Sequence, residues 1–105
     1  ALAHYDEIAS PGRPTATRIM AEQYAVRALV EDKRWEEAAK RLVALPDRYP
    51  EYSPFRENYL QAASIYDKEL GDRQRAEATL ETCVARYPNT DLARAASKEL
   101  ARLKR

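Results

Sequence analysis

Few side chains in this 105-residue sequence are suited to catalysis. The single cysteine, Cys83, could serve as a thiolate nucleophile only with a base beside it. The single histidine, His4, lies near the other end of the sequence, and we do not expect the two side chains to meet. Cys83 also occupies a position where the helical pattern requires a small apolar residue, so we interpret it as a thiol packed in the core. The sequence therefore predicts no catalytic residue and no enzyme activity.

Ligands for metals and phosphates are equally scarce. One cysteine and one histidine cannot supply the four ligands of a structural zinc site. The only glycines are Gly12 and Gly71, which are too few for a glycine-rich loop that cradles phosphates. We therefore predict no metal site and no cofactor. One cysteine permits no internal disulfide, so the sequence does not decide between an oxidising and a reducing compartment.

Composition and charge narrow the choice of partner. A formal net charge of +1 argues against a nucleic-acid partner, which normally requires a strongly basic face. No apolar run approaches the ~20 residues that a membrane-spanning helix needs. One basic stripe is present, with spacings of four, four and three: Arg94, Lys98, Arg102 and Arg105. We interpret it as a solvated helix face that suits the carboxyl end of a helix, with docking on an acidic partner or on lipid head groups as the alternative.

The elements that hold these residues are predicted by one apolar pattern that occurs three times. A small residue is followed by apolar residues at i+4 and i+7, which is one face of an α-helix. The copies are Ala1, Tyr5 and Ile8; Ala38, Leu42 and Leu45; and Ala76, Leu80 and Cys83. The steps between copies are 37 and 38 residues, and Arg-Tyr-Pro follows the last two copies at 48–50 and 86–88. Such a repeat predicts an α-solenoid, a fold that usually presents binding surfaces rather than catalytic sites.

Helix breakers divide the chain into an opening helix (1–9), two helical hairpins (15–50 and 53–88) and a closing helix (90–104). We interpret 1–9 as the second helix of a truncated hairpin, and the whole chain as one domain from a longer array. The first helix of the first hairpin is expected to turn inward Ile19, Tyr24, Ala25, Ala28 and Leu29. The predicted helix ends are Thr15, Ser53 and Asp72 as N-caps and Gly71 as a left-handed terminal residue.

Two local features stand apart from the repeat. Pro46 should bend the second helix or end it at Leu45, because proline removes a donor and leaves the carbonyl of Leu42 without its usual partner. Tyr52 and Phe55 lie in the loop between the hairpins, where they are either packed or available as a contact point.

The second hairpin carries a family pattern. Its residues are Tyr59, Ala62, Ala63 and Tyr66 in the first helix, Gly71 and Asp72 in the turn, and Ala76, Leu80, Cys83 and Pro88 in the second helix. These positions resemble the tetratricopeptide repeat, although the stretch from Tyr66 to Gly71 is one residue longer than usual. The first hairpin matches well only in its second helix. The resemblance implies an all-α fold, a right-handed α-solenoid of antiparallel helical hairpins, and a non-catalytic scaffold for protein–protein interaction.

The resemblance also implies a binding surface, because the first helices of such hairpins line the concave side of the solenoid. The residues of this concave face are Gln23, Arg27, Val30, Glu31, Leu60, Ser64, Asp67 and Lys68. Their mixture of polar and aliphatic groups suits another protein or a peptide segment. Arg27 and Lys68 are expected to set the charge preference, and Val30 and Leu60 to supply apolar anchoring.

Residues 86–93 resemble the Tyr-Pro-x-Ser/Thr-x-x-Ala junction that is frequent in bacterial envelope members of the family. This likeness implies a scaffold within a larger envelope assembly or export protein, in the periplasm or at the outer membrane. A cytoplasmic location is the alternative. Two other functions stay open: a docking or regulatory segment of a multidomain enzyme, and a module that self-associates through open solenoid ends.

Overall fold

Every element of the computed structural model is helical in the part of the chain that the structure describes, which is residues 5, 7–9, 12 and 14–105. The elements are α2 (Thr15–Glu31), α3 (Trp35–Arg48), the 3₁₀ turn η1 (Ser53–Glu57), α4 (Asn58–Ser64), the π-helical segment η2 (Ile65–Glu69), α5 (Arg73–Arg86) and α6 (Asp91–Leu103). Much of the predicted opening helix and of the linker that follows it, including Ala1 and His4, lies outside the described residues.

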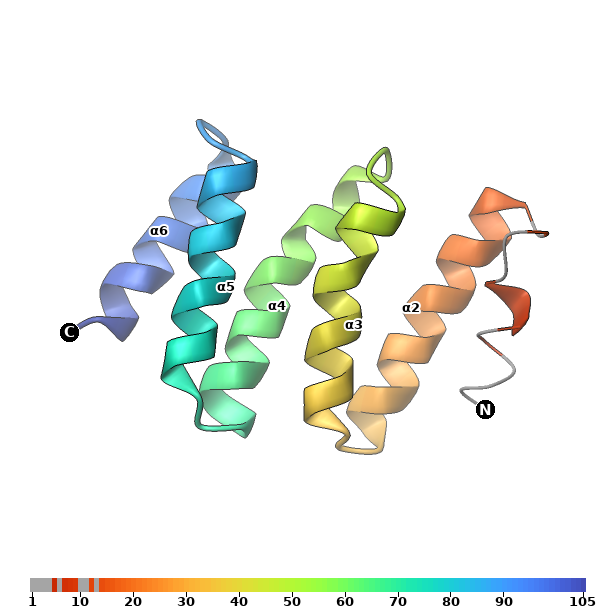
Figure 1. Cartoon of the computed structure of the whole chain (residues 1–105), viewed down its shortest axis with the longest axis horizontal. Helices are drawn as coiled ribbons and strands as arrows, with labels where there is room; N and C mark the ends of the chain where they lie inside the picture. Colours follow the sequence, from red (N-terminus) through yellow and green to blue (C-terminus); the bar gives the residue numbers. More distant parts are fainter. Residues whose placement is uncertain (1–4, 6, 10–11, 13) are drawn as a thin grey trace.

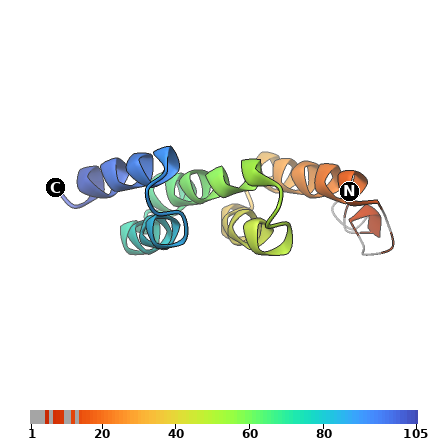
Figure 2. The same cartoon turned by 90° about the horizontal axis from the view of Figure 1, so that it is seen from above.

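The helices form two layers (Figure 1). Each of them packs against the next one along the chain, from α2 to α6. Figure 2 shows α2, α4 and α6 in one layer and α3 and α5 in the other. The Cα atoms extend over 44 × 30 × 14 Å, so the molecule is an elongated, thin slab. The prediction of an all-α solenoid built from helical hairpins is confirmed.

The repeated apolar pattern forms the core between the two layers. All six of its residues in α3 and α5 are buried: Ala38, Leu42, Leu45, Ala76, Leu80 and Cys83. Leu80 and Cys83 expose none of their surface. The predicted register of both second helices is therefore correct.

The inner face of α2 differs from the prediction at one aromatic residue. Ala25 and Leu29 are buried as predicted, but Tyr24 is 42% exposed. Its ring stacks on that of Tyr5, with 5.8 Å between the ring centroids. The other buried positions of this helix belong to Ala21, Glu22 and Val26. The prediction for Tyr24 was wrong because this side chain packs against the segment before the helix instead of against α3.

Helix ends follow the sequence prediction at two places and depart from it at two others. Asp72 accepts a hydrogen bond from the backbone N–H three residues on, and Gly71 has a φ of +61°, both as predicted. Thr15 is not a cap, because it is already the first residue of the helix and Pro14 stands before it. Ser53 lies within η1, and no side chain caps that turn. At both wrong positions a neighbouring proline, with its fixed φ, stands at the helix start in place of a hydroxyl cap.

Pro46 does not end its helix. Helix α3 continues to Arg48, so the prediction that it could stop at Leu45 was wrong. The missing N–H of proline is compensated from outside the helix: the side-chain amide of Asn58 donates to the carbonyl of Leu42 at 3.0 Å. The first residue of α4 thereby satisfies the carbonyl that the proline leaves without a partner.

The extra residue between Tyr66 and Gly71 is absorbed by the π-helical segment η2. The backbone N–H of Leu70 bonds the carbonyl of Ile65, five residues earlier, at 3.1 Å. A π-turn accommodates one additional residue without breaking a helix, and such turns are frequent at functional sites. The insertion therefore rotates the direction in which Asp67 and its neighbours project from the helix, without breaking the hairpin.

Charged side chains join the two hairpins at both ends of their second helices. Arg75, at the start of α5, donates to Glu36 of α3 at 2.7 Å and to the nearby Asp72 at 2.6 Å. At the other end, Arg86 of α5 lies 2.5 Å from Asp47 of α3. These pairs help to fix the orientation of one hairpin relative to the next, and hence the shape of the surface that both present.

Candidate protein-binding face

The eight residues predicted for the concave face all lie in the layer formed by α2, α4 and α6, or in η2, which continues α4. Five of them are exposed: Gln23, Arg27, Glu31, Ser64 and Lys68. The other three, Val30, Leu60 and Asp67, are half-buried. Seven of the eight line two separate hollows, one on either side of α4, and only Glu31 lines neither.

The α2–α4 hollow has a volume of about 350 Å³. Its apolar walls come from Val26, Val30, Leu42, Leu45, Pro54 and Phe55. Its polar lining is mostly uncharged, with the amides of Gln23, Asn58 and Gln61 and the guanidinium of Arg27. Of the two alternatives that the sequence left open for Phe55, the packed one is correct: Phe55 is buried, and Tyr52 packs edge-on against it with ring centroids 4.8 Å apart. The hollow is shaped for an apolar side chain.

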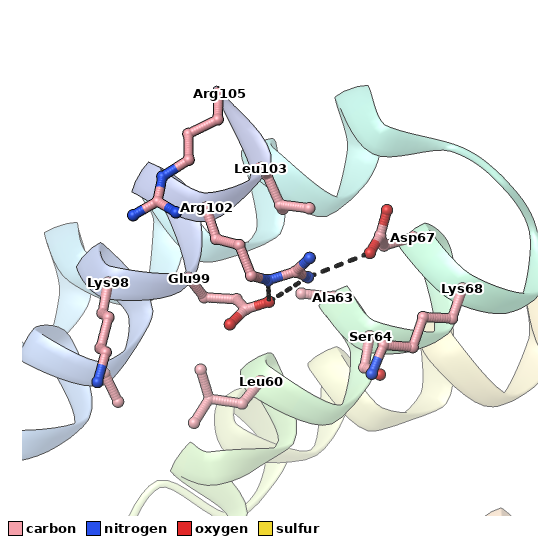
Figure 3. Close-up of a pocket in the computed structure, with 11 residues that line it drawn as sticks. Leu60, Ala63, Ser64, Asp67, Lys68, Lys98, Glu99, Arg102, Leu103 and Arg105 are labelled. Atoms are coloured by element: carbon pink, nitrogen blue, oxygen red, sulfur yellow. Dashed lines mark hydrogen bonds and ion pairs between the residues drawn. The ribbon is translucent and has the colours of Figure 1, made fainter.

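The α4–α6 hollow is larger, at about 640 Å³, and differs in chemistry (Figure 3). Its apolar lining includes Leu60, Ala63 and Leu103. Its charged residues are Asp67, Lys68, Lys98, Glu99, Arg102 and Arg105. Cations therefore outnumber carboxylates around an apolar base.

The basic stripe is not a surface separate from the concave face. Lys98, Arg102 and Arg105 line the same hollow as Leu60 and Lys68, whereas Arg94 pairs with Asp91 and lies outside it. All four residues of the stripe are exposed, as a solvated face requires, and three of them also line the hollow. The sequence did contain the signal, because a step of 38 residues carries Leu60 to Lys98, Ser64 to Arg102 and Asp67 to Arg105. Helix α6 continues the first-helix surface of the repeat.

One cation of the α4–α6 hollow is already neutralised. Arg102 donates from Nε to Glu99 at 2.6 Å and from Nη2 to Asp67 at 3.3 Å. The hydrogen bonds that Arg102 donates to Glu99 and, to a smaller extent, to Asp67 raise the pKa of Arg102. Within the described residues, the other three cations of this hollow form no ion pair: Lys68, Lys98 and Arg105. The hollow therefore carries positive charge available to a partner.

The π-turn contributes directly to this hollow. Asp67 and Lys68 both belong to η2, and Asp67 reaches across to Arg102 of α6. The side chain of Asp67 is only 17% exposed, whereas that of Arg102 is 49% exposed, and Lys68 lies beside Asp67 in the lining of the hollow. The extra residue in the sequence thus places one acid and one base where the face of α4 meets that of α6.

Cys83 does not have the surroundings of a reactive thiol. The thiol of Cys83 is buried, and burial raises its pKa, which disfavours the reactive thiolate. His4 lies outside the described residues. Over the described ranges, no group of three His, Cys, Asp or Glu side chains is placed to hold a metal ion. No described helix is long and apolar enough to cross a membrane.

Comparison with known families gives a match for the helices that contribute much of this face. Residues 57–90 match the family model of the tetratricopeptide repeat. The second hairpin is therefore similar to a tetratricopeptide repeat. The match covers the whole of α4, η2 and α5 and the junction that follows as far as Thr90, and so includes Leu60, Ser64, Asp67 and Lys68. No curated protein and no solved structure matches the chain.

The tetratricopeptide repeat is a protein–protein interaction module and is generally non-catalytic. Both properties agree with the absence of catalytic candidates in the sequence. The match also explains why the apolar pattern, the turn at Gly71 and the proline at 88 occur together.

Proposed function

We propose that this protein is a non-catalytic interaction module whose concave face, together with α6, binds a segment of another protein. The observation that carries this proposal is the α4–α6 hollow, in which an apolar base lies beside cations that have no partner within the described chain. Buried apolar contacts supply affinity, while charges at the rim orient the partner and exclude the wrong one. The tetratricopeptide match supports the proposal, because these repeats act in protein–protein interaction.

Site-specific photo-crosslinking tests which layer meets the partner. A photoreactive phenylalanine analogue replaces Gln23 or Ser64, which are exposed residues lining the two hollows. The matched controls replace Lys40 on α3 and Ala78 on α5, which are exposed residues of the other layer. In cells that express the full-length protein, the first two positions should yield a discrete crosslinked partner. Equal or stronger crosslinking from Lys40 and Ala78 would contradict the proposal.

We further propose that the module serves a larger bacterial envelope assembly or export protein, in the periplasm or at the outer membrane. The support is the sequence of the junction at 86–93. This junction has a folding role of its own, because Thr90 accepts a hydrogen bond from the backbone N–H of Ala93 at 3.0 Å and so starts α6. The ring of Tyr87 packs edge-on against Tyr59, with 6.1 Å between the centroids.

Location therefore needs its own measurement. An epitope-tagged full-length protein should be degraded by external protease once the outer membrane is permeabilised, while the inner membrane stays intact. Protection until the inner membrane is broken would support the cytoplasmic alternative. A full-length sequence with an attached catalytic domain would instead favour the docking segment of a multidomain enzyme.

A further inference from the structure

We propose that the concave face recognises one extended segment of its partner by two unlike contacts: an uncharged apolar side chain in the α2–α4 hollow and acidic side chains in the α4–α6 hollow. This inference rests on the proposed function and adds the chemical class of the bound segment. It follows from the difference between two hollows that lie on opposite sides of one helix.

The α2–α4 hollow selects for an apolar side chain on an extended backbone. Leu42, Leu45 and Phe55 close its base, and each of them is buried. Around them stand three side-chain amides: Gln23, Asn58 and Gln61. An amide both donates and accepts hydrogen bonds, so Gln23 and Gln61 can pair with the N–H and C=O groups of an extended chain. Asn58 already donates to Leu42, which fixes its orientation.

The α4–α6 hollow selects for negative charge. Its two carboxylates, Asp67 and Glu99, are both bound by Arg102. Neither carboxylate forms an ion pair with Lys68, Lys98 or Arg105, and the four cations outnumber the two carboxylates, so the hollow keeps a net positive charge. An incoming carboxylate therefore gains charge-assisted hydrogen bonds without displacing an existing pair. A basic segment would meet three unpaired cations instead.

The separation of the hollows predicts a spacing in the partner. Helix α4 alone lies between them, since Asn58 and Gln61 face one hollow and Leu60 and Ser64 the other. A helix with its side chains is about 10 Å across, and an extended chain rises about 3.3 Å per residue. The apolar and acidic residues of the partner should therefore be about three to four positions apart.

Synthetic peptides with blocked ends test this without knowledge of the natural partner. The probe is an acetylated and amidated peptide with one leucine, two serines and then two glutamates, made also in the reverse order because the chain direction is not fixed. In comparison peptides, serine replaces the leucine, or lysines replace the glutamates. Fluorescence anisotropy should show about tenfold weaker binding for the serine peptide and a larger loss for the lysine peptide. Binding of the glutamate peptide should weaken as salt is raised.

Protein variants assign the two contacts. Replacing Lys68 and Lys98 together by glutamine should reduce affinity for the glutamate peptide about tenfold or more, and Arg94→Gln should leave it unchanged. Arg94 is the matched control because it belongs to α6 and to the same basic stripe but does not line the hollow. Amide NMR shifts caused by the leucine should appear near Gln23 and Gln61, and those caused by the glutamates near Lys68 and Lys98.

Three results would overturn the inference. The first is equal binding of the lysine and glutamate peptides. The second is an unchanged affinity for the glutamate peptide in the Lys68/Lys98 double variant. The third is Lys98-dependent binding of phosphatidylglycerol vesicles, which would assign the cations to a lipid surface. If any of these occurred while crosslinks still formed at Gln23 and Ser64, the proposed function would stand and only this account of the partner would fall.

Discussion

The two hairpins use one position of the repeat in opposite ways. Glu22 on α2 and Leu60 on α4 are 38 residues apart, the same step that relates α3 to α5. Glu22 is completely buried and accepts hydrogen bonds from Arg41 at 2.8 Å, Arg48 at 2.6 Å and the hydroxyl of Tyr49 at 3.2 Å. Leu60 is half-buried and lines the α4–α6 hollow. The first hairpin thus places a carboxylate inside, where the second presents an apolar side chain to the surface.

The comparison shows that equivalent positions of the two hairpins can serve different purposes, stability in the first and partner binding in the second. In the first hairpin this position holds α2 against α3 through charge. In the second, the residue equivalent to Arg41 is Thr79, whose hydroxyl bonds the carbonyl of Arg75 in its own helix at 2.8 Å. No acid is required there, so Leu60 is available to a partner. Stability of the second hairpin then depends on apolar packing.

Leu80→Ala should destabilise the protein most. Leu80 exposes none of its surface in the core of the second hairpin, and truncation leaves a cavity that costs about 2–5 kcal/mol in the free energy of unfolding. Thermal unfolding should therefore begin at a much lower temperature than in the parent protein. For a domain of this size, a loss of 1 kcal/mol in the free energy of unfolding lowers the melting temperature by roughly four degrees or more. A melting temperature within about two or three degrees of the parent would therefore show that the second hairpin does not rely on this packing.

Glu22→Ala should destabilise by a smaller amount, about 1–3 kcal/mol, because it removes the buried carboxylate that accepts the hydrogen bonds of Arg41 and Arg48. Chemical denaturation gives the value directly. The comparison is sharpened by the double variant Glu22→Leu with Arg41→Thr, which copies the second hairpin at both positions. It should be more stable than Glu22→Ala, since an apolar side chain fills the site of the carboxylate and the cation that faced it is removed. A double variant less stable than Glu22→Ala would mean that the two hairpins are not equivalent at this position.

Asn58→Ala should cost about 1–2 kcal/mol, because the carbonyl of Leu42 then has no donor. The reason lies in Pro46, which cannot supply the usual N–H. In the Pro46→Ala background the helix can close its own hydrogen bond, so the same Asn58 substitution should cost clearly less. A double-mutant cycle in denaturant measures the coupling. If Asn58→Ala lowered the free energy of unfolding equally in both backgrounds, Asn58 would not compensate for the N–H that Pro46 lacks.

Acid should weaken the contact between the hairpins only slightly. Hydrogen bonds from Arg75 lower the pKa of Glu36 below its ordinary 4.5 and that of Asp72 below its ordinary 3.8. A carboxylate whose pKa is lowered by folding stabilises the protein above its ordinary pKa and loses that contribution as the pH falls through the lowered value. The melting temperature should therefore decline below about pH 4.5, and less steeply in Arg75→Gln. The same slope in both proteins would show that other carboxylates control acid sensitivity.

The sequence predicts the second helices well because the apolar period alone determines their register. Leu42, Leu80 and Cys83 are buried because a small residue with apolar neighbours at i+4 and i+7 has only one way to pack. The first helix of the first hairpin was harder to predict. There Glu22 carries a surface-type side chain into the core, and its partners Arg41 and Arg48 come from another helix. Periodicity does not reveal opposite charges that pair only when two helices meet.

The sequence predicts one concave face but does not predict that its residues are divided between two hollows. Seven of the eight concave-face residues line hollows, yet the two hollows differ because α3, η1 and α6 contribute the rest of each lining. The sequence did not identify Glu99 as a residue of this face, because Glu99 and Asp67 both accept hydrogen bonds from Arg102 only in the folded chain. The sequence showed the π-turn that carries Asp67 only as one extra residue between Tyr66 and Gly71.

The most direct test of the account is the affinity of the crosslinked partner for charge-reversed protein. Arg27→Glu with Lys68→Glu changes one cation in each hollow, and both side chains are exposed. The control is Arg73→Glu with Arg94→Glu, which reverses the same number of charges on exposed residues outside the two hollows. The account predicts at least about tenfold weaker binding for the first pair, unchanged binding for the second, and equal helicity in both. Unchanged binding in the first pair, or an equal loss in the second, would contradict the claim that the concave face binds the partner.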